Sequence, residues 1–115
     1  MDKIADVDID ASGRFKYILI KVVEKGSKNS KFIVRGYSRC NYHADIYDEV
    51  TPAIEAAGFK TDCPGGGRIL HEPEKKTIKV FGYSTGFGKA DHSLSVEILK
   101  KKYPDYNITW SDDGY

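Results

Sequence analysis

The sequence has few cysteines, no long apolar segment and almost no net charge, and each shortage excludes a class of protein. Two cysteines in 115 residues cannot form a disulfide framework, which indicates a reducing compartment such as the cytoplasm. No apolar run approaches the roughly 18 residues of a membrane-spanning helix, and residues 1–11 lack the apolar core of a signal peptide. A net charge of +1 provides no field for nucleic acid. We therefore expect a cytoplasmic protein that binds neither nucleic acid nor a membrane.

What the chain does contain is the composition of an ordinary globular protein, with 40% hydrophobic and 30% charged residues. A chain of this length supports one hydrophobic core, so we expect a single domain over residues 1–115 and a monomer. Residues 1–10 are acidic and are expected to form a flexible N-terminus, because chain ends are usually poorly ordered.

Six segments are dense in β-branched and aromatic residues and are predicted as strands: residues 14–23, 31–37, 59–63, 68–71, 77–83 and 107–110. The proline and three glycines of residues 64–67 are expected to break the chain between the third strand and the fourth. With one helix after the second strand and another before the last, the order predicts an α+β fold: a mixed sheet of about six strands with two helices.

The two helices are predicted from apolar spacing and from end signals. Apolar residues recur at spacings of four, four and three over residues 46–57, and Gly58 stands where a C-terminal cap is expected. Pro52 falls inside this pattern, so we expect a kink or a second helix start there. The second helix is predicted over residues 91–103, and Pro104 ends it.

His43 is the first candidate functional residue, because it lies where strand-like sequence meets the first helix. A helix N-terminus presents unpaired N–H groups and a partial positive charge, which together bind anions. Histidine can accept a proton or act as a nucleophile near neutral pH. A histidine at such a position predicts chemistry on a phosphate, whereas the plainer alternative is a boundary residue that makes one hydrogen bond.

The segment 82–89 (GYSTGFGK) follows a strand and precedes a helix, as phosphate-binding loops do. It does not fit the nucleotide-triphosphate pattern, because one residue too many separates Gly82 from Gly88 and Ala90 replaces the metal-binding hydroxyl. Successive backbone N–H groups of Ser84, Thr85 and Gly86 can still form an anion-binding nest. A tight turn that simply requires glycine is the alternative.

Other polar residues suggest further sites. Lys16 shares a strand face with Ile18, and Arg35 shares one with Ile33, so each is either a solvated strand-end charge or a cation aimed at an anion. Residues 63–68 resemble a cysteine phosphatase loop but have four residues between cysteine and arginine where that loop has five. The potential zinc ligands are Cys40, His43, Cys63 and His71, of which only the first two have a common ligand spacing.

Taken together, seven blocks of the sequence resemble the small phosphohistidine phosphatases of the Janus/Ocnus family. They are VDID at 7–10, FKYILI at 15–20, IVRGY at 33–37, YHADIYD at 42–48, GGGRI at 65–69, FGYS at 81–84, and YPDY at 103–106 with DGY at 113–115. The resemblance implies a single α+β domain. It also implies hydrolysis of the P–N bond of phosphohistidine, and of phospholysine as a related substrate, in phosphohistidine-containing proteins, with no metal and no cofactor.

The resemblance also assigns roles to residues. His43 matches the family's essential histidine, and it would act either as general base or as transient phosphoryl acceptor. The matches in the substrate and phosphate site are Lys16, Arg35, Tyr42, Ala44, Ser84, Thr85 and Gly86, with Arg68 and His92 as supporting residues. The loop departs from the mammalian pattern, in which methionine and alanine follow the serine. A non-enzymatic phosphate-recognising adaptor and a zinc-binding interaction module are the alternative functions.

Overall fold

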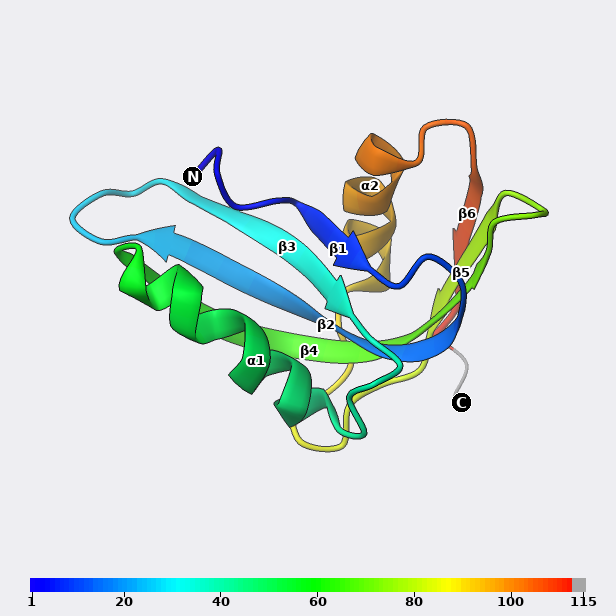
Figure 1. Cartoon of the computed structure of the whole chain (residues 1–115), viewed down its shortest axis with the longest axis horizontal. Coiled ribbons are helices and arrows are strands. Elements are labelled where there is room, and N and C mark those ends of the chain that lie inside the picture. Colours follow the sequence, from blue (N-terminus) through cyan, green and yellow to red (C-terminus); the bar gives the residue numbers. More distant parts are fainter. Residues whose placement is uncertain (113–115) are drawn as a thin grey trace.

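Residues 1–112, which the computed structural model describes, form a six-stranded sheet with one helix on each face (Figure 1). The strands are β1 (Val7–Ile9), β2 (Gly13–Glu24), β3 (Ser30–Gly36), β4 (Phe59–Glu72), β5 (Thr77–Phe81) and β6 (Asn107–Trp110), and the helices are α1 (His43–Ala56) and α2 (His92–Lys102). Their order in the sheet is β1-β3-β2-β4-β5-β6, with the outer pairs parallel and the inner pairs antiparallel. The predicted mixed sheet with two helices is confirmed. The DGY block at 113–115 lies outside the described residues.

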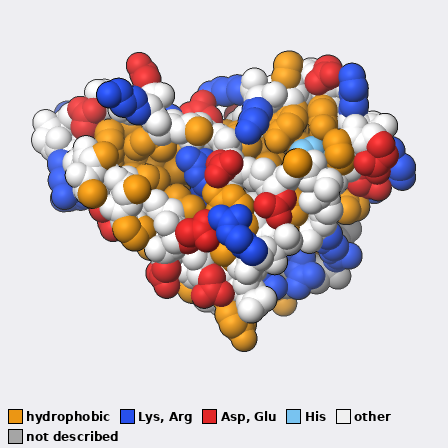
Figure 2. Space-filling view, in the orientation of Figure 1, with side chains coloured by type: hydrophobic (Ala, Val, Ile, Leu, Met, Phe, Trp, Pro, Cys, Tyr) orange, Lys and Arg blue, Asp and Glu red, His pale blue; other side chains and the backbone are white. Residues whose placement is uncertain are grey.

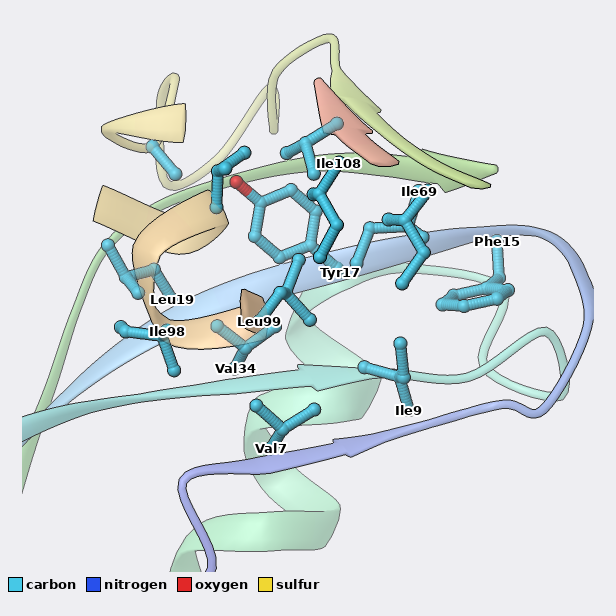
Figure 3. Close-up of a cluster of buried hydrophobic side chains, with 14 residues drawn as sticks. Val7, Ile9, Phe15, Tyr17, Leu19, Val34, Ile69, Ile98, Leu99 and Ile108 are labelled. Atoms are coloured by element: carbon cyan, nitrogen blue, oxygen red, sulfur yellow. The ribbon is translucent and has the colours of Figure 1, made fainter. Parts of the chain in front are cut away.

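The alternation of side chains along β2 builds a core on each face of the sheet. Tyr17 and Leu19 point toward α2, whereas Ile18 and Ile20 point toward α1, and all four are buried. Figure 3 shows the Tyr17 ring within the core on the α2 side, among aliphatic side chains from several strands. The sheet is thus buried on both sides at its centre, which explains the nearly continuous apolar run in β2.

The N-terminal segment departs from the flexible N-terminus that the sequence predicts. Val7–Ile9 form β1, an edge strand that pairs in parallel with β3, and Val7 and Ile9 are both buried in the core on the α2 side. The acidic composition concealed this strand, because only two of its three residues are apolar and three residues are too few for a clear alternation.

β4 is a single strand, so the predicted break at residues 64–67 is wrong. Phe59–Glu72 runs through the three glycines, with a register irregularity opposite the middle of β2. The glycines are needed for close approach rather than for a turn. A Cβ on Gly65, for example, would lie 2.5 Å from the backbone nitrogen of Ala90.

Of the two alternatives predicted at Pro52, a second helix start is wrong, because α1 is one helix from His43 to Ala56. Thr51, which precedes this proline, donates its hydroxyl to the carbonyl of Tyr47 at 2.8 Å, one turn earlier in the same helix. The helix ends as predicted, with Gly58 at a φ of 100°. Within the described residues, neither α1 nor α2 is long and apolar enough to cross a membrane.

Candidate functional site

A cleft of about 620 Å³ lies where β2, β4, the start of α1 and the loop after β5 meet. Its lining comprises Lys16, Asn41, Tyr42, His43, Ala44, Arg68, Ser84, Thr85, Gly86 and Phe87. All the residues that the sequence predicted for a phosphate site are therefore in one place, except Arg35 and His92.

His43 is the first residue of α1, and its ring lies against the glycines of β4. Its Nε2 is 2.9 Å from the carbonyl oxygen of Gly67, and a Cβ on Gly66 would lie 2.8 Å from its Cδ2. Because a carbonyl oxygen only accepts, Nε2 carries the proton and donates it. Cδ2 and Nε2 thus face β4, so Nδ1, on the other side of the ring, faces the cleft with its lone pair.

The surroundings of His43 favour its neutral form. Burial lowers the pKa of the imidazole below its ordinary value of 6.5, and the positive charges of Lys16 and Arg68 lower it further. The hydrogen bond with the Gly67 carbonyl opposes these effects. At neutral pH the cleft therefore contains an unprotonated Nδ1, which can act as a base or as a nucleophile.

The loop after β5 is held beside His43 by backbone hydrogen bonds. Gly66 donates its N–H to the carbonyl of Gly88, and Ala90 donates to the carbonyl of Gly66, both at 3.0 Å. Within the loop, Ser84 and Gly88 pair through their backbones, and the buried hydroxyl of Ser84 accepts from the N–H of Phe87 at 3.1 Å. The segment after β5 thus continues the sheet next to β4, where the glycines leave room for it.

Unpaired N–H groups converge on the cleft from two directions. In the loop, the N–H groups of Thr85 and Gly86 have no acceptor among residues 1–112. At the start of α1, Ala44 has an open N–H, while Asp45 accepts from the backbone of Tyr42 at 3.0 Å. Such a set of donors, with a helix N-terminus among them, is the arrangement that binds phosphate.

Two cations stand on the sheet beside these donors. Lys16 of β2 pairs in register with Arg68 of β4, and both side chains are on the same face of the sheet as α1. Both are half-buried, and both lie close enough to His43 to influence its pKa. They make the cleft positive, which suits a doubly charged phosphoryl group.

Arg35 is not in this cleft, and its predicted role there is wrong. Its guanidinium donates to the carbonyls of Val34 at 2.9 Å and Ala5 at 2.7 Å and lies in a separate cavity of about 890 Å³. On this side of the molecule, hydrophobic side chains gather between the N-terminal segment and α1 (Figure 2). The prediction placed Arg35 on the correct face, but β2 lies between its strand, β3, and the glycines of β4.

His92 supports the site from behind the sheet rather than from inside the cleft. It is buried on the α2 side, and its Nε2 donates to the carbonyl of Gly82 at 2.7 Å. Its Nδ1 accepts from the Tyr17 hydroxyl at 2.7 Å, so both ring nitrogens are engaged. Burial lowers its pKa as well. His92 therefore holds the start of the loop and cannot reach a ligand in the cleft.

The four potential zinc ligands do not converge. Cys63 and His71 stand eight residues apart on one strand, which separates them by about 26 Å. His71 donates to the carbonyl of Asp10 and accepts from the hydroxyl of Tyr106. No group of three or more metal-ligating side chains occurs within residues 1–112. The zinc-binding alternative therefore has no site in the described part of the chain.

Two lining residues, Asn41 and Phe87, were missed by the sequence analysis. Asn41 directly precedes Tyr42, and its amide was available as a signal because a polar residue next to a helix N-terminus often contacts the bound anion. Phe87 stood in a segment examined only for its glycines; its ring packs against Tyr47 of α1, with centroids 5.7 Å apart.

Comparison with known proteins identifies the family of this chain. The model of the Janus/Ocnus family matches residues 1–107. The 14 kDa phosphohistidine phosphatase of Sus scrofa is 51% identical over 98% of this chain and 94% of its own length, and the human protein of that name is 50% identical over 97% and 94%. Sex-regulated protein janus-A of Drosophila pseudoobscura pseudoobscura is 54% identical over 98% of this chain and 78% of its own. The chain therefore belongs to the Janus/Ocnus family.

Proposed function

We propose that this protein hydrolyses the P–N bond of phosphohistidine in phosphoproteins. The observation that carries the proposal is the neutral His43, whose free Nδ1 faces a cleft lined by backbone N–H donors and two cations. Two relatives about 50% identical over nearly the whole chain are named 14 kDa phosphohistidine phosphatase, which supports the same activity.

The phosphoryl group binds between the loop and the start of α1. Its oxygens accept from the N–H groups of Thr85, Gly86 and Ala44, and Lys16 with Arg68 balance its charge. These donors are held in place before the substrate arrives, so they need no reorganisation as charge shifts in the transition state. Tyr42, which is exposed at the rim, contacts the substrate chain rather than the phosphoryl group.

The chemistry then follows one of two routes at Nδ1 of His43. In both routes the other ring nitrogen of the substrate imidazole carries a proton from solvent, so the group leaves as neutral imidazole when the P–N bond breaks and its electrons return to the leaving nitrogen. As general base, Nδ1 takes a proton from water while the water oxygen attacks phosphorus and the P–N bond breaks. As nucleophile, Nδ1 bonds to phosphorus while the P–N bond of the substrate breaks, and water hydrolyses the resulting phosphohistidine of this protein in a second step. Both routes require the lone pair that the Gly67 carbonyl orients, and neither requires a metal or a cofactor. Phospholysine, whose phosphoryl group is also bound to nitrogen, is a second candidate substrate.

The proposal is tested by following release of phosphate from a phosphohistidine protein with wild type and the His43→Ala variant. We expect turnover by wild type that a chelator leaves unchanged, and a loss of at least about 1000-fold in the variant. The Cys63→Ser variant is a matched control, since Cys63 is not in the cleft lining and its thiol pKa is raised to about 11 by burial.

Each other outcome has a definite meaning. Tight binding of the phosphoprotein without turnover would identify a phosphate-recognising adaptor instead. Full activity of His43→Ala would contradict the assignment of the reacting residue. Rapid quenching in alkali of a reaction with radiolabelled substrate separates the two routes, because only the nucleophilic route transfers label to this protein, in a bond that survives alkali and is lost in acid.

We further propose that the protein acts as a monomer in the cytoplasm, without binding nucleic acid or membranes. Cys40 and Cys63 are both free thiols, as a reducing compartment would keep them. The edge strands β1 and β6 have only three and four residues, which limits pairing between copies. Size-exclusion chromatography with light scattering, at concentrations spanning the cellular range, tests the monomer.

A further inference from the structure

A second, smaller groove of about 240 Å³ continues from the His43 cleft along the bare end of the sheet. It shares Lys16, Asn41 and Arg68 with the cleft and adds Arg14 and Ser38. The groove exists because α1 begins at His43, so the sheet face beyond its first turn has no helix over it. Lys and Arg side chains gather on this part of the surface, beyond the N-terminal end of α1 (Figure 2).

The charged side chains that line the cleft and the groove are all positive. Among residues 1–112, no aspartate or glutamate lines the cleft or the groove, although the whole chain has 17 acidic and 18 basic residues. The cavity around Arg35, by contrast, is lined by Asp8 and Glu49. Such segregation in a nearly neutral protein points to an anionic ligand at the groove.

Arg14 adds a third cation to Lys16 and Arg68, and it lines the groove but not the cleft. Its guanidinium carbon lies over the ring of Phe81, 5.1 Å from the centroid, and no hydrogen bond from its N–H groups is found within residues 1–112. Neither Arg14 nor Lys16 forms an ion pair with a carboxylate within residues 1–112. Stacked and without a carboxylate partner, Arg14 is set to receive one from another molecule.

We propose that this groove binds an acidic side chain of the substrate protein, a few residues from the phosphohistidine, and that Arg14 determines this preference. The inference rests on the proposed function and names the class of substrate that it acts on. Arg14 pairs in register with Leu70, four residues along β4 from Gly66 at the His43 ring, which is about 13 Å. An extended peptide covers that distance in about four residues, and long side chains shorten the required separation to two.

The test uses phosphohistidine peptides in which one glutamate is moved from four residues before the phosphohistidine to four residues after it. Each peptide is matched by one with glutamine at that position. We expect kcat/KM for the best glutamate peptide to exceed its glutamine match by about threefold to fivefold at low salt, the size of an exposed ion pair. The preference should shrink as salt is added.

Three variants show whether Arg14 is responsible. Arg14→Gln should bring the ratio to about one, and Arg14→Glu should favour a lysine peptide, because the sign of the interaction reverses. Both should hydrolyse free phosphoimidazole, which has no flanking residues, at the wild-type rate. Lys21→Gln is the matched control: Lys21 is an exposed cation of the same strand, on the face toward α2, and its loss should leave the ratio unchanged.

The outcomes separate this inference from the proposed function. Hydrolysis of phosphoimidazole and of all peptides at the same kcat/KM would overturn the inference alone. A glutamate preference that survives Arg14→Glu would also overturn it. Absence of phosphoimidazole and peptide turnover by wild type would contradict the proposed function and the inference together.

Discussion

Two histidines stand on opposite faces of the same glycines of β4 and differ in what their second ring nitrogen meets. His43 and His92 are both buried, and each donates from Nε2 to a backbone carbonyl. In His92 the remaining nitrogen accepts a hydrogen bond from Tyr17, inside the core on the α2 side. In His43 the remaining nitrogen faces a positive cleft. The same residue type thus secures the fold on one side of a strand and offers a lone pair to a ligand on the other.

The difference shows that burial and a depressed pKa do not by themselves identify a reactive histidine. Burial is the largest cause of the lowered pKa at both positions. What separates them is access: His43 lines the cleft, whereas both ring nitrogens of His92 are hydrogen-bonded, to Tyr17 and to Gly82. When activity and stability are measured on the same variants, we expect replacement of His43 to reduce activity and replacement of His92 to reduce stability.

The largest expected effect comes from replacing each histidine by glutamine. His43→Gln should reduce kcat by about 1000-fold or more with little change in melting temperature, because the side chain bears the reacting lone pair. His92→Gln should cost about 2–3 kcal/mol of stability, since Tyr17 and Gly82 lose their partner. Phosphate release measures kcat and thermal unfolding measures stability, and both are determined for each variant. A large loss of kcat in a folded His92→Gln protein would show that the two faces are not separate.

The next largest effect is expected at the glycines that separate the two rings. A Cβ on Gly67 would lie 2.3 Å from the carbonyl oxygen of Phe81 and 2.7 Å from Cε1 of His92, so Gly67→Ala should destabilise the protein by about 3 kcal/mol. Gly86→Ala is the matched control for stability, because nothing lies within 4 Å of its added Cβ and its φ is not positive. Thermal unfolding compares the two variants. Equal melting temperatures would mean that β4 moves to accommodate the methyl group.

These glycines also show where prediction from sequence fails. Strands β2, β3, β5 and β6, both helices and the place of His43 at the start of α1 were predicted, because apolar spacing and end signals are local properties of the chain. The run 64–67 was predicted as a break, because the atoms that an added Cβ would meet lie on β2, β5, both helices and the loop, far away in sequence. Arg35 failed for the same reason: alternation gives the face of a strand, but its neighbours depend on sheet order, which no local pattern contains.

A smaller effect is expected when only the Tyr17 hydroxyl is removed. Its oxygen lies 2.7 Å from Nδ1 of His92 and 3.0 Å from Oγ of Ser95, so Tyr17→Phe leaves a buried acceptor without a donor. We expect a loss of about 1–2 kcal/mol in the free energy of unfolding, with kcat almost unchanged. Tyr106→Phe is the control, since its hydroxyl also donates to a histidine, His71, but at 3.2 Å and with part of the side chain exposed. Equal losses of unfolding free energy in the two variants would mean that the Tyr17–His92 hydrogen bond contributes no more to stability than the Tyr106–His71 bond.

The smallest effect concerns the pKa of His43, and it tests whether the charges of the cleft lower this pKa in addition to burial. With its pKa below 6.5, His43 stays neutral as the pH falls through 6.5 and loses its lone pair only at lower pH, so the acid limb of kcat/KM should lie below pH 6.5. Because both histidines take up protons less readily when folded than when unfolded, stability should fall as the pH drops below 6.5.

In Lys16→Met a nearby positive charge is gone, so the pKa of His43 should rise while that of His92 stays the same. NMR titration of the two Cε1–H signals measures both values in one sample. Equal shifts of the two signals would indicate a general change in the fold, whereas a shift confined to His43 would mean that Lys16 acts on this histidine through its charge in the cleft.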